Sequence, residues 1–131
     1  MRTAEVMPPA LRAALVELLG DDVDDVEIVE HSPYARLHLG ARATTRRNRI
    51  LLRGSAADFF DDPELVLHEY FHVLRQWNRG RLSIASYLVE WLRRGYFENR
   101  YERQARRYAR LRLPALLAQL RQRGPGPVRN A

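Results

Sequence analysis

The sequence has no cysteine, no lysine and no long run of apolar residues. Without cysteine, disulfides and thiolate zinc sites are excluded, so any metal site must use histidine and carboxylate ligands. No apolar segment approaches the roughly 20 residues that are needed to cross a membrane. The first turns of the chain alternate apolar and charged side chains, which is unlike a secretory signal peptide. We therefore expect a cytoplasmic protein without a membrane span.

The charge of the chain is distributed unevenly along its 131 residues. Residues 1–74 hold 8 Arg and 13 Asp or Glu, a net charge of −5, whereas residues 75–131 hold 14 Arg and 3 Glu, a net charge of +11. The C-terminal half could therefore bind an acidic partner, nucleic acid or an anionic membrane. The hydrophobic fraction of 46% fits one globular domain, which we place at residues 1–123, followed by a disordered tail at 124–131.

Periodicity and turn residues predict an α+β domain with an N-terminal helix, a small sheet and three to four further helices. The first half should hold a helix at residues 9–19 that ends at Gly20, a strand at 26–29 and a hairpin of strands at 43–45 and 50–53. The segment at 32–39 fits a short helix or a strand equally well. If the strand at 50–53 lies along the cleft, a peptide substrate could add to its edge in extended form.

The second half of the chain should be helical. A helix begins at Pro63 after the capping residue Asp62, and it ends near residues 78–80. A third helix is expected from Ser83 to residue 94 with Gly95 as its stop. A fourth runs from about residue 97 to 111, and Pro114 either kinks it or restarts it.

The most informative motif is H-E-x-x-H, formed by His68-Glu69-Tyr70-Phe71-His72 inside the helix that begins at Pro63. Side chains four residues apart lie on one face of a helix, so both imidazoles can reach one metal ion. Glu69 lies beside the first histidine and could act as a base on the attacking water. This combination is typical of zinc hydrolases.

A catalytic zinc usually takes a third protein ligand. The metzincin pattern would place Gly at position 75 and His at 78, so Arg75 and Asn78 exclude that class. His31 and His38 are further candidates, although we favour a surface or core role for both. The remaining solution is a glutamate from a later helix, for which Glu98 and Glu102 are available.

The segment from Glu102 through Ala105 to Ala109 resembles the E-x-x-A-x-x-x-A ligand helix of gluzincin-type peptidases. Together with the segment around the His-Glu motif, it makes roughly residues 8–109 similar to the core domain associated with bacterial extracellular contractile injection systems, which is metallopeptidase-like. The resemblance implies a minimal zincin-like fold and one zinc ion held by His68, His72 and Glu102, with Glu69 as general base. It also makes delivery by a secretion or injection machine compatible with a cytoplasmic origin.

This chain departs from the family pattern where relatives often carry an aspartate and it has Arg106. Glu98 could supply the missing acidic group that orients a ligand histidine, or it could exchange roles with Glu102. Both glutamates could also merely balance the surrounding arginines.

Three functional hypotheses follow. The first is a zinc metallopeptidase that hydrolyses peptide bonds, for which the candidate transition-state stabilisers are Tyr70, Tyr87, Tyr96, Tyr101 and Arg75. The second is a non-catalytic, zinc-stabilised binding module. The third is association with nucleic acid or an acidic protein through the Arg-rich C-terminal helix, whose candidate contacts are Arg100, Arg103, Arg106, Arg107, Arg110 and Arg112.

Overall fold

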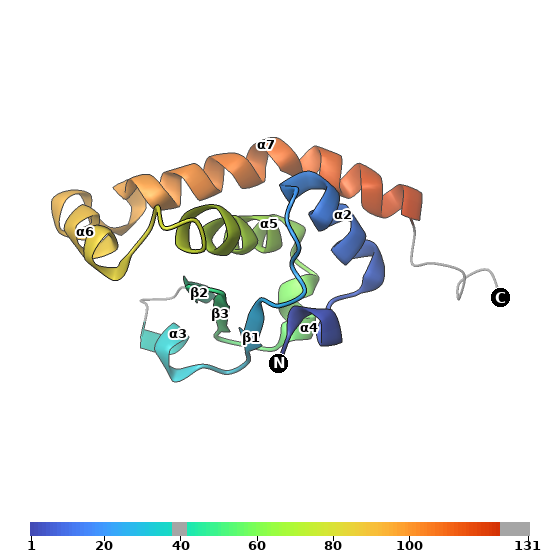
Figure 1. Cartoon of the computed structure of the whole chain (residues 1–131), viewed down its shortest axis with the longest axis horizontal. Coiled ribbons are helices and arrows are strands. Elements are labelled where there is room, and N and C mark those ends of the chain that lie inside the picture. Colours follow the sequence, from blue (N-terminus) through green and yellow to red (C-terminus); the bar gives the residue numbers. More distant parts are fainter. Residues whose placement is uncertain (38–41, 124–131) are drawn as a thin grey trace.

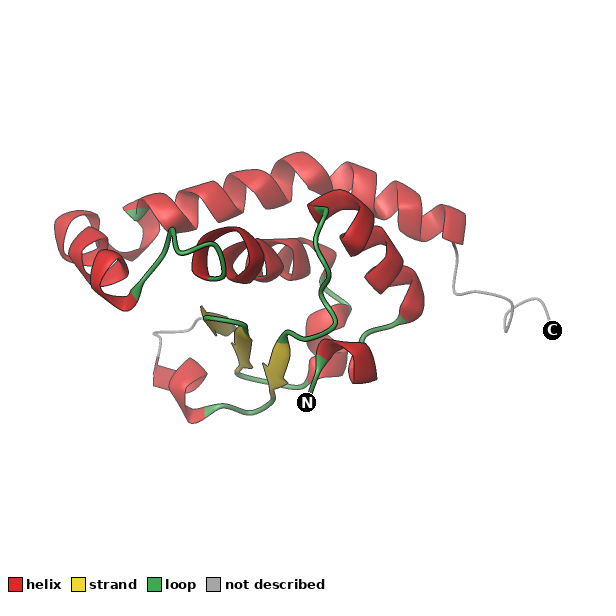
Figure 2. Ribbon diagram, in the orientation of Figure 1, coloured by secondary structure: helices red, strands yellow, loops and turns green. Residues whose placement is uncertain are grey.

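The computed structural model describes residues 1–37 and 42–123, without the side chains of residues 36, 37 and 95–98. Helices dominate the described chain, and the strands form one small sheet (Figure 2). The predicted α+β class is therefore confirmed. In chain order the elements are α1 (Thr3–Val6), α2 (Pro9–Leu19), β1 (Glu27–Val29), α3 (Pro33–Leu37), β2 (Ala43–Arg46), β3 (Arg49–Leu52), α4 (Ala56–Phe60), α5 (Pro63–Phe71), η1 (His72–Trp77), α6 (Ile84–Glu98) and α7 (Arg100–Arg123).

Helix α2 has the bounds that the sequence predicts, and its end has a simple physical cause. Gly20 adopts a left-handed conformation with a φ of 73°, which glycine reaches without steric cost, and its amide donates to the carbonyl of Val16. Leu11, Leu15 and Leu19 recur along one side of the helix and are buried. Burial of this stripe holds α2 against the rest of the domain.

The sheet has the strand order β1-β3-β2, with β1 parallel and β2 antiparallel to β3. The predicted hairpin is confirmed, and its turn contains Asn48 with a φ of 54°. Because β3 pairs on both sides, the expectation that a substrate adds to the strand at 50–53 is wrong. The edge strand is β2. The other edge, along β1, is covered by the chain start, where the Met1 amino group donates to the Ile28 carbonyl at 2.9 Å.

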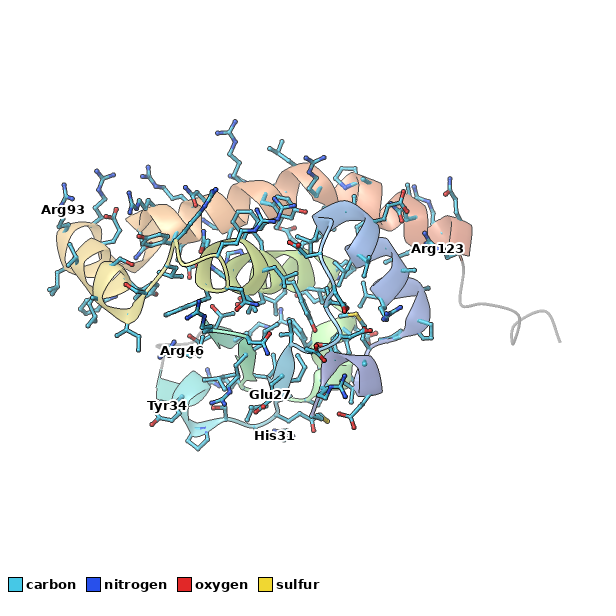
Figure 3. All side chains as sticks on the ribbon, viewed as in Figure 1. Glu27, His31, Tyr34, Arg46, Arg93 and Arg123 are labelled. Carbon is cyan, nitrogen blue, oxygen red and sulfur yellow. The ribbon has the colours of Figure 1, made fainter. Side chains whose placement is uncertain are left out.

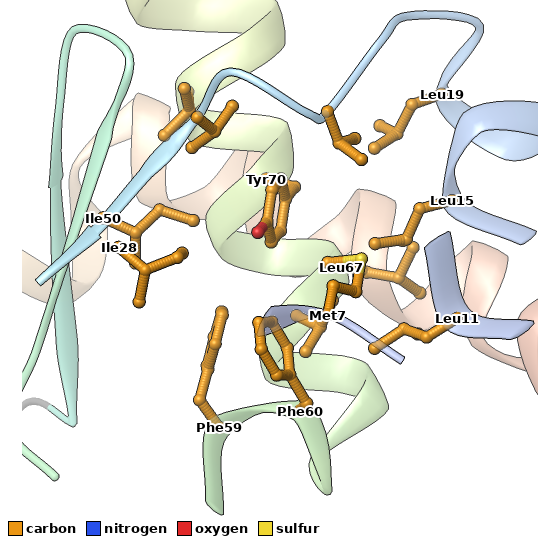
Figure 4. Close-up of a cluster of buried hydrophobic side chains, with 14 of the residues drawn as sticks. Met7, Leu11, Leu15, Leu19, Ile28, Ile50, Phe59, Phe60, Leu67 and Tyr70 are labelled. Atoms are coloured by element: carbon orange, nitrogen blue, oxygen red, sulfur yellow. The ribbon is translucent and has the colours of Figure 1, made fainter. Parts of the chain in front are cut away.

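The domain is layered, with α5 between the sheet and the long helix α7 (Figure 1). The core lies where side chains of the sheet, α2, α4 and α5 meet; those labelled in Figure 4 are Met7, Leu11, Leu15, Leu19, Ile28, Ile50, Phe59, Phe60, Leu67 and Tyr70. Tyr70 is fully buried, and its hydroxyl lies 2.7 Å from the Thr3 hydroxyl. This packing fixes α5 in rotation, so that the side of α5 opposite Tyr70 and Leu67 is free to carry chemistry.

The structure contains two short helices that the sequence did not predict clearly. The ambiguous segment at 32–39 is helical over Pro33–Leu37, and the unpredicted helix Ala56–Phe60 begins after Ser55, whose hydroxyl accepts from the Asp58 amide at 3.1 Å. Phe59 and Phe60 anchor this helix in the core. Its single turn is too short to show a helical period in the sequence.

The predicted boundaries in the second half need correction. Ser83 does cap α6, but this helix passes through Gly95 and ends at Glu98. Helix α7 begins at Arg100 and continues through Pro114 without a break. Glycine and proline disfavour helix interiors by about 1 and 3 kcal/mol, and around Pro114 tertiary packing overrides this cost. Ala109 and Leu116, on either side of Pro114, are both fully buried in the main core.

Within the described chain, no helix combines the length and hydrophobicity that a bilayer crossing requires. The predicted tail at 124–131 and the candidate ligand His38 lie outside the described residues.

Candidate metal centre

The motif helix α5 begins as the sequence predicts. The Asp62 carboxylate accepts from the Leu65 amide at 3.2 Å, and Pro63 occupies the first helical turn. Asp62 also pairs with Arg42 at 2.6 Å, which ties the start of α5 to the residue before β2. Since Leu67 and Tyr70 face the core, the three polar residues of the motif face the opposite side of α5.

Three side chains converge on this side. Nε2 of His68 lies 3.2 Å from Nε2 of His72, and the Glu102 carboxylate lies 3.0 Å from the first and 3.2 Å from the second. One ligand atom from each residue fits within a group no wider than 4.8 Å. His72 and Glu102 are buried and His68 is half-buried. The two imidazoles and the carboxylate could therefore hold one metal ion.

Glu102 reaches the histidines because α7 starts close to them and packs closely on α5. The buried Asn99 caps α7 by accepting from the Tyr101 amide at 2.8 Å, which places Glu102 in the first helical turn. A carboxylate is favoured there by the helix dipole. Ala105 and Ala109 follow on the same side, and both have no exposed surface. Their small side chains permit the close approach of the two helices.

A second layer of hydrogen bonds orients His72. Gln76 is buried, and its Nε2 donates to the carbonyl of Tyr101 at 3.1 Å. Its Oε1 therefore faces His72 and accepts from Nδ1 at 2.6 Å. The unprotonated nitrogen of neutral His72 is then Nε2, which points toward Glu102. Such outer hydrogen bonds fix the tautomer of metal-binding histidines.

Gln76 belongs to the segment η1, which winds as a π-helix from His72 to Trp77. The amide of Asn78 accordingly donates to the carbonyl of Val73, five residues earlier, at 2.8 Å. At the end of the segment, Nε1 of Trp77 donates to the Thr45 hydroxyl at 3.1 Å and so connects the helix to β2. Segments of π-helix occur frequently at functional sites.

The charges of the site are strongly coupled. Burial lowers the pKa of His72, but the Glu102 carboxylate, with smaller contributions from Glu69 and the Gln76 hydrogen bond, outweighs this effect and raises the pKa to about 9. Burial raises the pKa of Glu102, but His72 and His68 lower it well below its usual range. Burial also raises the pKa of Glu69, and the two histidines offset this only in part. Glu69 therefore has a higher proton affinity than an exposed carboxylate, as a general base near neutral pH requires.

A small cavity opens beside this group. It is lined by all four residues of β2 and by side chains of α5, η1, α6, α7 and the loop between η1 and α6; they are Ala43, Thr44, Thr45, Arg46, Glu69, His72, Trp77, Leu82, Tyr87 and Glu102. Because consecutive residues of β2 line the cavity, it runs along the edge of this strand that pairs with no other strand in the described part of the chain. Burial, followed by the charge of Glu102, raises the pKa of Tyr87 to about 12. The phenol at the cavity wall stays protonated at neutral pH.

The other candidate stabilisers lie elsewhere. Arg75 donates to the Leu19 carbonyl and faces Asp21, so it is directed toward the end of α2 and does not line the cavity. The Tyr101 hydroxyl accepts from Arg100 at 2.8 Å, and that of Tyr70 is directed into the core. The side chain of Tyr96 is outside the described part.

The structure also separates the two glutamates. Glu98 is the last residue of α6, whereas Glu102 is in α7, so the expectation that they share one helix is wrong. The side chain of Glu98 is not described. His31 is exposed and lies at the end of the molecule far from α5 and α7 (Figure 3). It is not part of the group formed by His68, His72 and Glu102.

The Arg-rich helix α7 carries most of its charge on its outer side. Many of its side chains point away from the molecule in Figure 3, and Arg100, Arg103, Arg107, Arg110 and Arg112 are exposed, while Arg106 is half-buried. The only acidic residue of α7 is the buried Glu102. A positively charged surface is therefore present, and its partner stays a prediction.

The geometry of the group formed by His68, His72 and Glu102 fits tetrahedral coordination of one metal ion. Two ligands at about 2.1 Å from one ion in tetrahedral geometry lie about 3.4 Å apart. The three observed separations of 3.0 to 3.2 Å are close to this value. Two imidazoles with one carboxylate form a donor set that catalytic zinc sites use.

Comparison with known proteins places the chain in a family. No curated protein and no solved structure shows significant similarity to it. The family model of the eCIS core domain matches residues 6–80, which include α2, the sheet and the complete H-E-x-x-H motif. Glu102 lies beyond the matched segment. Because the match covers more than half of the sequence, the chain belongs to the eCIS core domain family, which is associated with extracellular contractile injection systems.

Proposed function

We propose that this domain is a zinc-dependent peptidase in which His68, His72 and Glu102 hold the metal and Glu69 is the general base. The observation that carries the proposal is the convergence of the three ligand atoms within 4.8 Å, beside a buried glutamate at a cavity. When bound, zinc supplies Lewis acidity that activates water and polarises a carbonyl group.

The residues of the chain supply the proton transfers. Glu69 is buried, lines the cavity and has a raised pKa, so it suits the uptake of a proton from water and its delivery to the leaving amine. The protonated Tyr87 hydroxyl lies on the same cavity wall and is the candidate donor to the developing oxyanion. Among the tyrosines with described side chains, only Tyr87 lines this cavity.

The unpaired edge of β2 supplies a binding surface for an extended substrate. Peptides that add to a sheet edge gain main-chain hydrogen bonds, and side-chain pockets then determine specificity. Residues 43–46 run along the cavity that contains Glu69, so a peptide paired with β2 would pass the general base. We therefore propose unfolded or extended protein segments as substrates, and the family association fits delivery of the domain by an injection system.

The test compares zinc-loaded wild type with Glu69→Gln on a panel of denatured proteins, with cleavage detected by mass spectrometry. We expect wild type to cleave, and Glu69→Gln to lose about 10²–10⁴-fold of the rate while it retains one zinc ion. Equal activity of the variant would contradict the role of Glu69. Stoichiometric zinc without any cleavage by wild type would favour the non-catalytic, zinc-stabilised module.

A further inference from the structure

Helix α6 exposes a continuous apolar face. Its large apolar side chains retain much of their accessible surface: 61% for Ile84, 51% for Leu88, 54% for Val89, 44% for Trp91 and 76% for Leu92. Ile84, Leu88 and Leu92 follow one another at four-residue spacing, and Trp91 and Val89 flank this row on either side. These five residues define the α6 face.

The α6 face lies opposite the side of the helix that packs on the domain. Helix α6 is attached to the domain by its other side, where Glu90 is buried and the half-buried Tyr87 packs on a cluster of Trp77, Leu82 and Tyr101. The helix lies at one end of the molecule, where the α6 face is not covered by the rest of the described chain (Figure 1).

The size of the α6 face is that of an interaction site. With about 150–250 Å² for a large side chain, the exposed fractions amount to about 500 Å² of mostly apolar surface. The largest apolar patch of a typical monomer is about 300–600 Å² and is often functional. A standard interface buries about 800 Å² per partner, so the α6 face fits a small partner element that binds with moderate affinity.

The charges around the α6 face are positive. Arg81 precedes the helix, and Arg93 lies one turn after Val89; both are exposed, and neither has an ion-pair partner among the described residues. The only acidic side chain described on α6 is that of Glu90, which is buried and pairs with Arg94 at 3.4 Å. A partner that covers the apolar row therefore gains from acidic residues at its borders.

The same charges disfavour a second copy of the chain as the partner. Two α6 helices that packed on each other in antiparallel orientation would bring Arg93 of one copy near Arg81 of the other. Like charges at such a border are unfavourable, and the described face offers no acidic side chain to compensate for them.

We propose that the α6 face is a docking site for an amphipathic helix of another protein, with an apolar stripe bordered by Asp and Glu. A row of side chains at four-residue spacing is a ridge that fits the groove of a second helix. Recognition of this kind uses apolar anchors at positions i, i+3, i+4 and i+7 of the partner. This inference does not depend on catalysis, although Tyr87 of the same helix lines the cavity, so that a docked protein would lie beside it.

The test uses synthetic 18-residue peptides with one Leu stripe and either Glu or Lys at its borders. The chain has two Trp, and Trp77 is buried, so binding to the α6 face should appear as a blue shift in the emission of the half-exposed Trp91. We expect saturable one-to-one binding of the Glu peptide, at least ten-fold tighter than that of the Lys peptide at low salt.

Two sets of variants locate the site. Leu88→Ser with Leu92→Ser should weaken binding of the Glu peptide at least ten-fold, whereas Leu111→Ser, at a similarly exposed leucine of α7, should leave it unchanged. Arg81→Glu with Arg93→Glu should reverse the preference between the peptides. All these positions are exposed, so the variants should keep the wild-type circular dichroism spectrum and unfolding midpoint.

Three results would overturn the proposal. Equal binding of both peptides would show non-specific apolar association. Sedimentation of the free protein as a dimer that Leu88→Ser with Leu92→Ser dissolves would assign the α6 face to a second copy. Binding to vesicles of anionic phospholipid without binding to the Glu peptide would assign it to a membrane surface.

Discussion

Nδ1 of His72 donates a hydrogen bond of 2.6 Å to Oε1 of Gln76, and both side chains are buried. The Gln76 amide is held in turn by the Tyr101 carbonyl and by Gln104, each at 3.1 Å. The end of the motif helix and the start of α7 thus share one hydrogen-bond network. This network presents Nε2 of His72 to the carboxylate of Glu102, on the neighbouring helix.

Replacement of Gln76 should weaken the metal site without removing a ligand. For Gln76→Leu we expect zinc affinity to fall about 10–100-fold, because His72 loses the partner that fixes its tautomer and ring orientation. Competition with a fluorescent chelator measures the change. Gln119→Leu, on the remote part of α7, is the matched control and should have wild-type affinity. Unchanged affinity in Gln76→Leu would show that the network does not support metal binding.

Zinc binding should release a proton at neutral pH. In the metal-free protein burial lowers the pKa of His72, but Glu102, Glu69 and the Gln76 hydrogen bond together raise it above the usual 6.5 to about 9, so the imidazole is protonated at pH 7.5. A metal ligand must be neutral, so the proton leaves when zinc binds. Apparent zinc affinity should therefore rise as the pH increases toward 9 and level off above it.

Calorimetry in buffers of different ionisation enthalpy measures this proton. We expect release of about one proton per zinc at pH 7.5 and a value near zero above pH 10. Without zinc, the stabilisation from protonated His72 should be complete below pH 6.5 and disappear as the pH rises through about 9. Zinc binding without proton release at pH 7.5 would contradict the coupling between His72 and Glu102.

We expect the positively charged outer side of α7 to bind polyanions. We expect wild type to bind duplex DNA weakly at 50 mM salt and to lose affinity steeply with added salt. Arg103→Glu should weaken this binding several-fold, whereas Arg53→Glu, an exposed arginine of the acidic half, should change it little. Fluorescence anisotropy with a labelled duplex measures both. Absence of binding at 50 mM salt would remove nucleic acid as a partner of this surface.

Pro114 should be a destabilising residue that the surrounding packing tolerates. It is exposed in the interior of α7, where it lacks an amide donor, so Pro114→Ala should raise the free energy of unfolding by about 1–3 kcal/mol. Pro63→Ala is the control. It should not raise the free energy of unfolding, because proline is favoured in the first helical turn. Urea denaturation measures both variants. A loss of stability in Pro114→Ala would show that α7 needs the proline.

The parts of the site that the sequence predicts correctly depend on local signals. Asp62 and Pro63 define the start of α5, and the spacing of His68 and His72 alone places both imidazoles on one face. Glu102 was suggested by a family resemblance in a segment that contains Ala105 and Ala109. The structure shows the physical reason for this pattern, since both alanines are fully buried on α7, which packs closely on α5.

What the sequence could not predict depends on contacts between distant residues. Gln76 resembles any polar residue on a helix, and only the π-helical turn and the Tyr101 carbonyl reveal its role. Helix α7 continues past Pro114 because its packing on the core outweighs the local cost of proline, and local propensities do not include this packing. For Gln76, the sequence contains one indication of a contact with His72, which is its position four residues later in the same helix.

The metal centre is tested most directly by the metal content of the purified protein after dialysis against trace zinc, measured by mass spectrometry. We expect one zinc ion per chain in wild type, none above background in Glu102→Ala, and one in Glu64→Ala, an exposed acid of the same helix α5 that serves as control. Wild type without zinc, or Glu102→Ala with a full equivalent of zinc, would contradict this expectation.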